Sequence, residues 1–389
     1  MILPLLLAFA SQGAPNILVV ILDDVGWIDL SLVDTPSIDH LASQGRTYQR
    51  FYVTPLCSPS RSQIFYGVAP AVTGMGAPLG PGDPFEIPAQ YETFPRLLRG
   101  IGYSTAVFGK VHTVSREPAD VLREFGEGHA WTPGNLGSEF VGTEHGNYYK
   151  WLRGDGEEKS AETTYATTAV TDAALEWIAL RKESPWCAVV AYHAVHAIWE
   201  PVPGGKDGTE RELLEDMLAF MDLELGRLLG SVDLQTTLVY LVSDNGTPDA
   251  EPDPTGGSGK GTLAETGIRV PLIVAGWDEP KGVSDALVCA DQIHGDILSR
   301  ACGTGSALGG ETCFVQRFRP NGYGPRNLDR RAAILASPWV KLIRTGRTEQ
   351  LRALPSGELL DPEDHPEIVA RLRKIMAQGD PPARASNRR

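Results

Sequence analysis

Short, uniformly apolar runs alternate with longer amphipathic stretches up to about residue 310. Apolar runs of this kind predict strands, and apolar residues at three- and four-residue spacing predict helices. Because the runs are apolar throughout, we expect an α/β fold with a large, mostly parallel sheet that helices flank on both faces. The expected strands are residues 17–22, 104–108, 187–191, 238–242 and 270–275.

Capping residues mark the ends of the expected helices. Thr35 and Pro36 begin one helix that Gly45 ends, and Thr93 caps another that runs to Gly100. Three longer amphipathic stretches also predict helices, at about 162–182, 211–229 and 285–301.

The pattern changes at about residue 311, where short strand-like pieces such as RAAILA and WVKLIRT are separated by Gly, Pro and Asn and followed by a helical pattern. We therefore expect a catalytic α/β domain at 15–310, a small antiparallel sheet plus helix at 311–378, and a disordered tail at 379–389.

The net charge and the hydropathy of the chain limit its possible binding partners and its cellular location. With 35 basic and 49 acidic residues, the net charge of -14 excludes general binding of nucleic acid or anionic membranes. Residues 1–10 are apolar and end in Ala-Phe-Ala, which predicts a signal peptide and a periplasmic or secreted protein. A misplaced start codon or a buried first strand are alternatives, because no basic residue precedes the run. No other stretch reaches the ~20 apolar residues of a membrane span.

The five cysteines do not form a disulfide framework. Cys302 and Cys313 are close enough in sequence to pair in an exported protein, whereas Cys187 and Cys289 lie in apolar segments typical of a core. Cys57 differs from these because Pro59 follows it at the first turn of an expected helix, where backbone N–H groups favour negative charge. A thiolate nucleophile is one interpretation of Cys57.

Reactive side chains follow four of the expected strands. Since ligands of open α/β sheets bind beyond the carboxyl ends of the strands, these side chains are expected to share one site. They are Asp23, Asp24, Lys110, His112, His193, His196, Asp244 and Asn245.

The oxygen donors in this set predict a divalent cation site, and the cationic groups predict a binding site for an anion. Three carboxylates and an amide suit Ca²⁺ or Mg²⁺ better than zinc. The lysines and histidines, with Lys260 from a Gly-rich loop, would surround a tetrahedral anion and neutralise charge on a leaving oxygen. Taken singly, the Asp pair could cap a helix, Asp-Asn-Gly could form a turn, and His193 could be a hydrogen-bonded core residue.

The segment C-S-P-S-R at 57–61 resembles the sulfatase signature C-x-P-S-R, in which the cysteine is oxidised to Cα-formylglycine. The resemblance covers most of the chain and implies an alkaline-phosphatase-like fold and a sulfuric ester hydrolase, matured by a formylglycine-generating enzyme. Other segments that resemble the family are NILVVILDDVGW, TPSIDHLASQGRTYQRFYVTPL, GKVH, AYHAVHAIWEP, SDNG, GKGTLAETGIRVP and GELLDPEDHPE.

The resemblance also implies roles by position. One hydroxyl of the hydrated aldehyde would attack sulfur, and the second, once deprotonated, would expel sulfate. Arg61 would hold the formylglycine, His112 would act as base, and His196 or Lys260 would help to protonate the leaving alcohol. The implied sulfate-binding residues are Lys110, His196 and Lys260. The implied ligands of Ca²⁺, with Mg²⁺ as the alternative, are Asp23, Asp24, Cys57, Asp244 and Asn245.

Four positions depart from the family pattern. Tyr66 replaces Thr in the signature, Val195 and Ile198 replace prolines around His196, and Thr266 replaces a glycine. A phosphonate monoester or phosphodiester hydrolase of the same superfamily is the alternative function, although such relatives tend to carry Gln and His at the positions of Asp24 and Asn245. A non-catalytic anion-binding relative would lack a catalytic group, and none is missing.

Aromatic and acidic residues indicate which class of substrate the protein would accept. The aromatic set would stack on a sugar or aryl ring, or pack within long loops. An acidic loop at 249–254 disfavours densely sulfated polymers if it faces the pocket. We expect a singly sulfated carbohydrate or a small organosulfate. The aromatic set is Trp131, Tyr148, Tyr149, Trp151 and Trp199.

Overall fold

The computed structural model describes residues 13–80, 83, 85–113, 117–138, 140–181, 185–248, 257–318 and 328–379. The expected signal peptide, the acidic loop at 249–254 and all but the first residue of the expected tail lie outside these ranges. Within them, no helix is long and apolar enough to cross a membrane.

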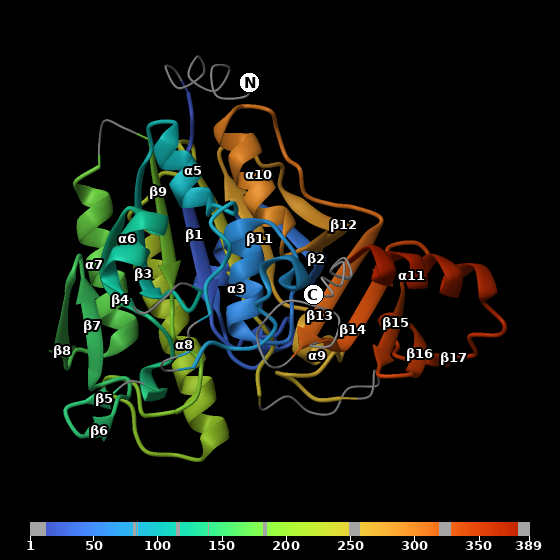
Figure 1. The fold of residues 1–389 in the computed structure, drawn as a ribbon. Helices are drawn as coiled ribbons and strands as arrows, with labels where there is room; N and C mark the ends of the chain where they lie inside the picture. Colours follow the sequence, from blue (N-terminus) through green and yellow to red (C-terminus); the bar gives the residue numbers. More distant parts are fainter. Residues whose placement is uncertain are drawn as a thin grey trace, which may run out of the picture.

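A ten-stranded mixed sheet forms the centre of the molecule (Figure 1). Five neighbouring strands at its centre, β10, β1, β9, β3 and β4, run parallel, and β12 is parallel to β2. The spatial order is β12 (Gly282–Cys289), β2 (Gly45–Tyr52), β11 (Leu272–Gly276), β10 (Thr237–Ser243), β1 (Asn16–Leu22), β9 (Trp186–Ala191), β3 (Ser104–Lys110), β4 (Glu127–Thr132), β7 (Trp151–Asp155) and β8 (Glu158–Glu162).

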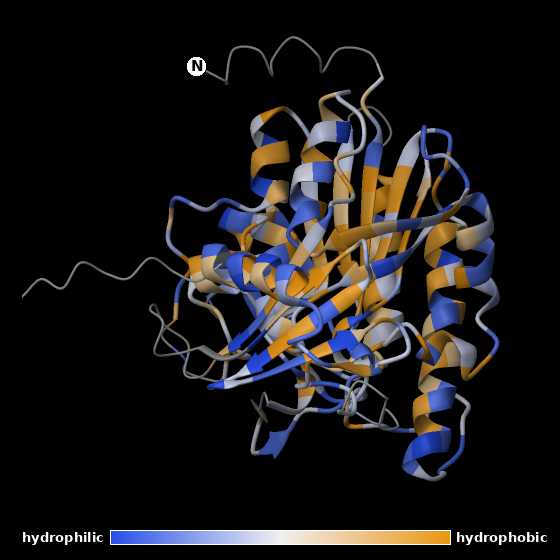
Figure 2. Ribbon diagram, turned by 90° about the vertical axis from the view of Figure 1, so that its right-hand side faces the viewer, coloured by the Kyte–Doolittle hydropathy of each residue, from blue (hydrophilic) through white to orange (hydrophobic). Residues whose placement is uncertain are grey.

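Helices cover both faces of this sheet, because successive side chains of a strand point to opposite faces. Leu18 and Val20 pack on one side and Ile17 and Val19 on the other, all fully buried. The first face is covered by α2 (Pro36–Gln44), α7 (Ala166–Ala179) and α8 (Glu210–Leu229). The second is covered by α3 (Cys57–Tyr66), α5 (Phe94–Gly100), α6 (Pro118–Phe125) and α10 (Gln292–Ala301). Figure 2 shows the resulting hydrophobic central strands beside amphipathic helices.

A second, five-stranded antiparallel sheet follows. One face packs against α11 (Pro366–Gly379) through Leu342 and Leu372, and the other packs against the main body through Ile334 and Ile268. The fold prediction of a mostly parallel sheet with a small antiparallel annex is therefore confirmed. The strands are β13 (Thr312–Phe318), β14 (Leu328–Leu335), β15 (Val340–Thr345), β16 (Thr348–Ala353) and β17 (Leu359–Leu360).

Short elements complete the described chain. They are η1 (Asp29–Ser31), α4 (Pro70–Thr73), η2 (Leu136–Ser138), β5 (Phe140–Val141), β6 (Glu144–His145) and α9 (Glu265–Ile268).

One expected helix is partly wrong. The stretch 285–301 begins as strand β12 and becomes helical only at Gln292. Leu287 and Val288 pair with Arg50 and Phe51 of β2, so sheet pairing overrides the helical pattern of the first residues. The expected strand at 270–275 is present as β11, but it runs antiparallel to β10.

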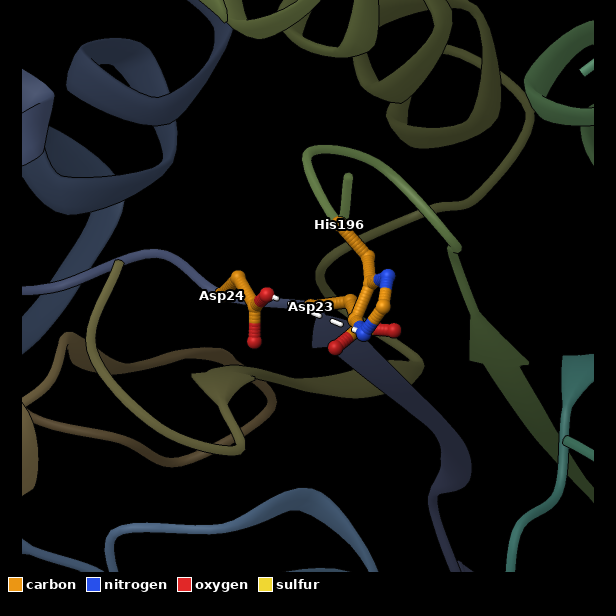
Figure 3. Close-up of side chains that lie close together, drawn as sticks. All are labelled: Asp23, Asp24 and His196. Carbon is orange, nitrogen blue, oxygen red and sulfur yellow. Dashed lines mark ion pairs between the residues drawn. The ribbon is translucent and has the colours of Figure 1, made fainter. Parts of the chain in front are cut away.

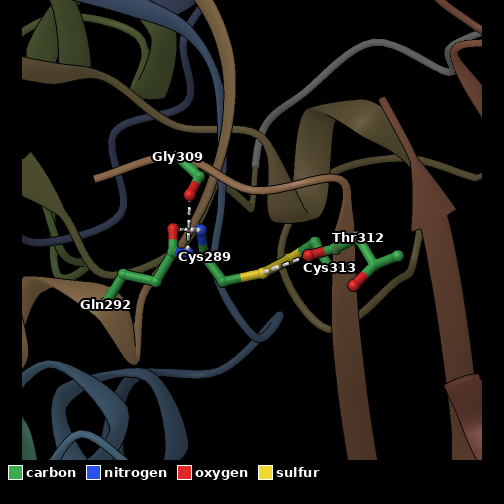
Figure 4. Close-up of a disulfide and its surroundings, with 5 residues drawn as sticks. All are labelled: Cys289, Gln292, Gly309, Thr312 and Cys313. Atoms are coloured by element: carbon green, nitrogen blue, oxygen red, sulfur yellow. Dashed lines mark hydrogen bonds between the residues drawn. A yellow bond between two sulfur atoms is a disulfide. The ribbon is translucent and has the colours of Figure 1, made fainter. Parts of the chain in front are cut away.

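The expected cysteine pairing is also wrong. The disulfide joins Cys289 at the end of β12 to Cys313 in β13, with their Cα atoms 5.7 Å apart (Figure 4). A bridge between Leu287 and Gly310 aligns the two segments and brings these cysteines together. Cys302, at the C-terminal end of α10, is free, since Cys313 is bonded to Cys289. Cys187 is buried in β9, as expected of a core residue.

Candidate active site

The candidate site lies at the carboxyl edge of four adjacent parallel strands, β10, β1, β9 and β3. Asp23 follows β1, Asp244 follows β10, Lys110 ends β3, and His196 lies in the loop after β9. Parallel strands end at the same edge, which is why residues far apart in sequence meet here.

Helix α3 brings Cys57 and Arg61 to the same edge. Cys57 is its first residue and Arg61 lies one turn further on, and both are buried. The Arg61 Nε donates a hydrogen bond of 2.7 Å to Asp244 Oδ2, and its guanidinium also donates to the carbonyl of Lys110. Its second terminal nitrogen lies 3.7 Å from Asp23 Oδ2. Arg61 therefore ties α3 to three of the strand ends.

Two lysines pair with the two adjacent aspartates. The Lys110 ammonium donates to Asp23 Oδ2, and both groups are buried. The Lys260 ammonium donates to Asp24 Oδ1 at 2.6 Å and to Oδ2 at 2.9 Å. Burial alone would raise the pKa of Asp24, but Lys260 and His196 outweigh burial and hold that pKa below its usual value. Asp24 is therefore an anion in this site.

The segment that carries Lys260 packs directly against the strand-end residues. A Cβ at Gly246 would lie 1.7 Å from the carbonyl oxygen of Thr266, so only glycine fits after Asn245. Thr266 Oγ1 accepts a hydrogen bond from the N–H of Gly259, the residue before Lys260. Thr266, one of the departures from the family pattern, therefore helps to fix this loop.

Asp23, Asp24 and His196 form a group of possible metal ligands. One ligand atom from each lies within 4.8 Å of the other two (Figure 3). The His196 Nε2 is 3.9 Å from Asp24 Oδ2. His196 had been assigned to the anion on the basis of sequence, and the structure places it beside the carboxylates.

The donor set fits a hard divalent cation. Asp23 Oδ1 and Asn245 Oδ1 are buried and have no hydrogen-bond partner among the described residues, although buried oxygens are normally paired. Three carboxylates are balanced by Arg61, Lys110 and Lys260, so the cluster is formally neutral. A divalent ion would use the unpaired oxygens and leave a net positive site for an anion.

Two histidines differ in how their rings are held. The Nε2 of His112 lies 3.0 Å from the carbonyl oxygen of Leu79, which makes Nε2 the donor and leaves the buried Nδ1 as an acceptor that no described residue pairs with. Burial, aided by Lys110, holds the pKa of His112 well below its usual value. Burial also lowers the pKa of His196, although Asp24 opposes this shift. Both rings are therefore neutral bases at pH 7.

The groups that hold the histidine loop are not evident from the sequence. The Tyr148 hydroxyl lies 2.7 Å from the carbonyl oxygen of His193 and 2.9 Å from that of His196. His193 Nε2 is 2.7 Å from Thr132 Oγ1, and Trp199 Nε1 donates to the carbonyl of Val195 at 2.9 Å. Nothing in the sequence marks Tyr148 for this role.

Most of the aromatic set is unavailable for stacking on a substrate. Trp131, Tyr148 and Trp151 are buried, so their alternative interpretation as packing residues is correct. Tyr149 is 37% exposed and Trp199 is only partly buried against the core.

Fold and site together define an α/β protein with a buried cluster of carboxylates and cationic side chains at the carboxyl edge of its sheet. The model of the Sulfatase family matches residues 15–303, and the chain belongs to this family.

Individual relatives carry related names. The N-acetylgalactosamine-6-sulfatase of Sus scrofa is 30% identical over 300 residues, which cover 68% of this chain and 57% of the relative. The N-acetylglucosamine-6-O-sulfatase of Bacteroides thetaiotaomicron is 32% identical over 198 residues, or 49% of this chain and 32% of the relative. The chain thus spans less than two thirds of the length of these relatives.

A solved structure, Ps i-CgsB in complex with k-i-k-neocarrahexaose, shares the fold. It superposes with a TM-score of 0.78 at 20% identity and covers 94% of this chain and 93% of its own. At this identity the similarity supports the fold alone.

Proposed function

We propose that the protein is a sulfuric ester hydrolase that cleaves a sulfate monoester of a carbohydrate. The observation that carries this proposal is the position of Cys57, at the N-terminus of α3 beside three aspartates and three cationic side chains. The names of the two relatives, both sulfatases of N-acetylated amino sugars, support a carbohydrate substrate.

Cys57 is proposed to be the precursor of Cα-formylglycine, made by a formylglycine-generating enzyme. Burial raises the pKa of the Cys57 thiol, although Lys110 and Lys260 oppose the shift. A thiol with a raised pKa is a poor thiolate nucleophile. The hydrated aldehyde would supply a hydroxyl nucleophile instead, whose second hydroxyl allows sulfate release.

Asp23, Asp24, Asp244 and Asn245 are proposed to hold Ca²⁺, with Mg²⁺ as the alternative, together with the modified Cys57. A divalent cation would withdraw charge from the sulfate oxygens and from the nucleophilic hydroxyl. All four side chains are buried oxygen donors on the two central strand ends.

Other residues of the chain would orient residue 57, bind the sulfate and transfer protons. Arg61, fully buried and hydrogen-bonded to Asp244, orients residue 57 one turn before it. Lys110 and Lys260 would bind sulfate oxygens, and His112 Nδ1 would accept a proton from the nucleophilic residue. The His196 side chain is 20% exposed, so its neutral ring can contact a leaving alcohol that extends toward solvent, and the Lys260 ammonium would protonate that alcohol.

A comparison of substrates tests this proposal. Protein from a host that makes formylglycine should hydrolyse an aryl sulfate and N-acetylgalactosamine 6-sulfate, and Cys57→Ala should be inactive on both. Equal or faster turnover of an aryl phosphonate would instead favour the phosphonate monoester hydrolase.

Export is a further part of the proposal. The Cys289–Cys313 disulfide supports an oxidising compartment such as the periplasm or the extracellular space. N-terminal sequencing of protein from its native host should give Ser11 as the first residue. A mature protein that keeps Met1 would contradict cleavage.

A further inference from the structure

We propose that a second pocket, apart from the candidate active site, binds an uncharged carbohydrate unit. A cavity of about 500 Å³ is lined by the C-terminal end of α3, the segment 86–91 and residues of α5 and α6. This volume lies within the range of small-molecule sites, ~300–1,000 Å³.

The pocket is separate from Cys57. Tyr66, which lines it, is nine residues further along α3 than Cys57. At ~1.5 Å per residue the two backbone positions are about 14 Å apart. A ligand in this pocket is therefore either a separate molecule or a part of the substrate distant from the candidate active site.

The helical wall of the pocket is held by aromatic packing. Phe65, beside Tyr66, packs at 6.0 Å between ring centroids on Phe94 of α5 and at 5.0 Å on Phe125 of α6. Gly67 ends α3 in the left-handed region at φ 67°, where a Cβ would meet the ring of His294. The backbone of α3 at Tyr66 is therefore held in place by the packing of this helix on both neighbouring helices.

Tyr66 presents an unused hydroxyl to this pocket. The residue is 6% exposed, and its hydroxyl has no hydrogen-bond partner among the described residues. Burial raises the pKa of Tyr66 well above its usual value, so the group is a neutral phenol that can donate. Tyr66 is also the position at which the chain departs from the family signature.

Two further pocket residues have polar atoms without partners. Glu124 is 4% exposed; its Oε1 accepts from Arg96 at 3.2 Å and from Arg123 at 3.0 Å, but its Oε2 has no partner among the described residues. Thr113 Oγ1 is likewise buried, and no described residue pairs with it. Buried polar atoms are normally paired, so two such atoms beside the free hydroxyl of Tyr66 favour a polar ligand.

The charges and polar groups that line the pocket favour an uncharged, hydroxyl-rich ligand. Three carboxylates against two guanidinium groups give a net negative lining, which disfavours sulfate and phosphate. Sugar hydroxyls both donate and accept, which matches a phenol, a hydroxyl and a half-paired carboxylate. The rings of Tyr66 and Tyr91 add flat apolar surface of the kind that packs on a sugar ring.

Titration of the full-length protein with galactose, glucose and N-acetylgalactosamine tests the proposal, with isothermal calorimetry as the measurement. At least one sugar should bind saturably with one site per chain. Tyr66→Phe should weaken that binding about 5-fold, the usual size of one hydrogen bond. Tyr66→Thr, which restores the family residue and removes the ring, should weaken it further.

Controls separate binding from folding and from catalysis. The thermal midpoint of Tyr66→Phe should match wild type, because the lost hydroxyl had no partner. Tyr103→Phe, which removes a hydroxyl that donates to the Pro15 carbonyl outside the pocket, should bind sugar normally. The unmodified Cys57 protein should also bind, so failure of the proposed function would leave this result intact. No saturable binding, or equal binding by wild type and Tyr66→Thr, would overturn the proposal.

Discussion

Two buried charge clusters differ in how completely their oxygens are paired. The sheet-edge cluster is the candidate active site, and the α10 cluster joins β10, α10 and the segment before β12. The sheet-edge cluster comprises Asp23, Asp24, Arg61, Lys110, Asp244, Asn245 and Lys260. The α10 cluster comprises Tyr48, Tyr240, Glu279, Asp296 and Arg300.

The α10 cluster is closed. Asp296 Oδ2 accepts from Tyr240 and, at 3.1 Å, from Arg300, and its Oδ1 accepts from Ser306 at 2.8 Å and from the backbone of Ala307. In the sheet-edge cluster, by contrast, no described residue donates a hydrogen bond to Asp23 Oδ1. Complete pairing stabilises a fold, whereas unpaired buried oxygens mark a place where something else binds.

The largest effect is expected from Cys57. Cys57→Ala removes the proposed nucleophile, so kcat on an aryl sulfate should fall at least about 1,000-fold. Cys187→Ala is a matched control, since Cys187 is an equally buried cysteine in β9 outside both clusters. Activity retained by Cys57→Ala would show that the sheet-edge cluster is not the active site.

Matched Asp→Asn substitutions, one in each cluster, test most directly whether the two clusters have different roles. Asp296→Asn should lower the free energy of unfolding by about 2 kcal/mol or more, because it removes one of the two carboxylates that pair with Arg300 and weakens a buried acceptor of four hydrogen bonds, while the activity per folded molecule stays unchanged. Asp24→Asn should lower kcat/KM about 100-fold or more with a smaller loss of stability, because Lys260 keeps some solvent contact. Urea unfolding and steady-state kinetics measure both, and similar behaviour of the two variants would contradict the distinction.

Metal binding should depend on the sheet-edge cluster alone. A chelator should abolish turnover, and Ca²⁺ added at 100 times its Kd should stabilise the chelated protein by about 2.7 kcal/mol. The stabilisation should disappear in Asp24→Asn and persist in Asp296→Asn. Differential scanning calorimetry with Ca²⁺ and Mg²⁺ measures this and ranks the two ions. Equal stabilisation of both variants would place the ion elsewhere.

The smallest effect concerns Asp291, at the start of α10. Burial raises its pKa to about 6, compared with about 3.9 in an unfolded chain. The carboxyl is mostly protonated in both states well below pH 4, and above about pH 6 the folded state carries a partly desolvated charge that, among the described residues, backbone N–H groups alone stabilise. Stability should therefore fall by about 1–2 kcal/mol as pH rises from 4 to 6.

Asp291→Asn should remove that part of the pH dependence. Urea unfolding of wild type and Asp291→Asn at several pH values between 4 and 7 measures the difference. The two curves should converge near pH 4 and separate toward pH 7, with the variant more stable. Parallel curves would show that Asp291 keeps an ordinary pKa in the folded protein.

The sequence was most informative where local pattern and chemistry coincide. The apolar runs that became β1, β3, β9 and β10 end in residues of the candidate site, and parallel strands necessarily bring those ends together. Pro59 in the first turn of α3 likewise predicted that Cys57 lies at the start of this helix.

Features set by distant contacts were not predictable. The antiparallel direction of β11 and the strand at 282–289 depend on pairing with β10 and β2. The partner of Cys313 depends on how β12 meets β13, and the bond from Tyr148 to the histidine loop depends on a long connection. No periodicity or spacing in the sequence encodes these contacts.

The central claim is that Cys57 becomes the catalytic aldehyde, and mass spectrometry of the peptide that spans residues 51–61 tests it most directly. Active protein from a host with a formylglycine-generating enzyme should show an aldehyde in place of the thiol at position 57. The fraction converted should rise and fall with specific activity across preparations. Fully active protein with an unmodified thiol at Cys57 would contradict the account.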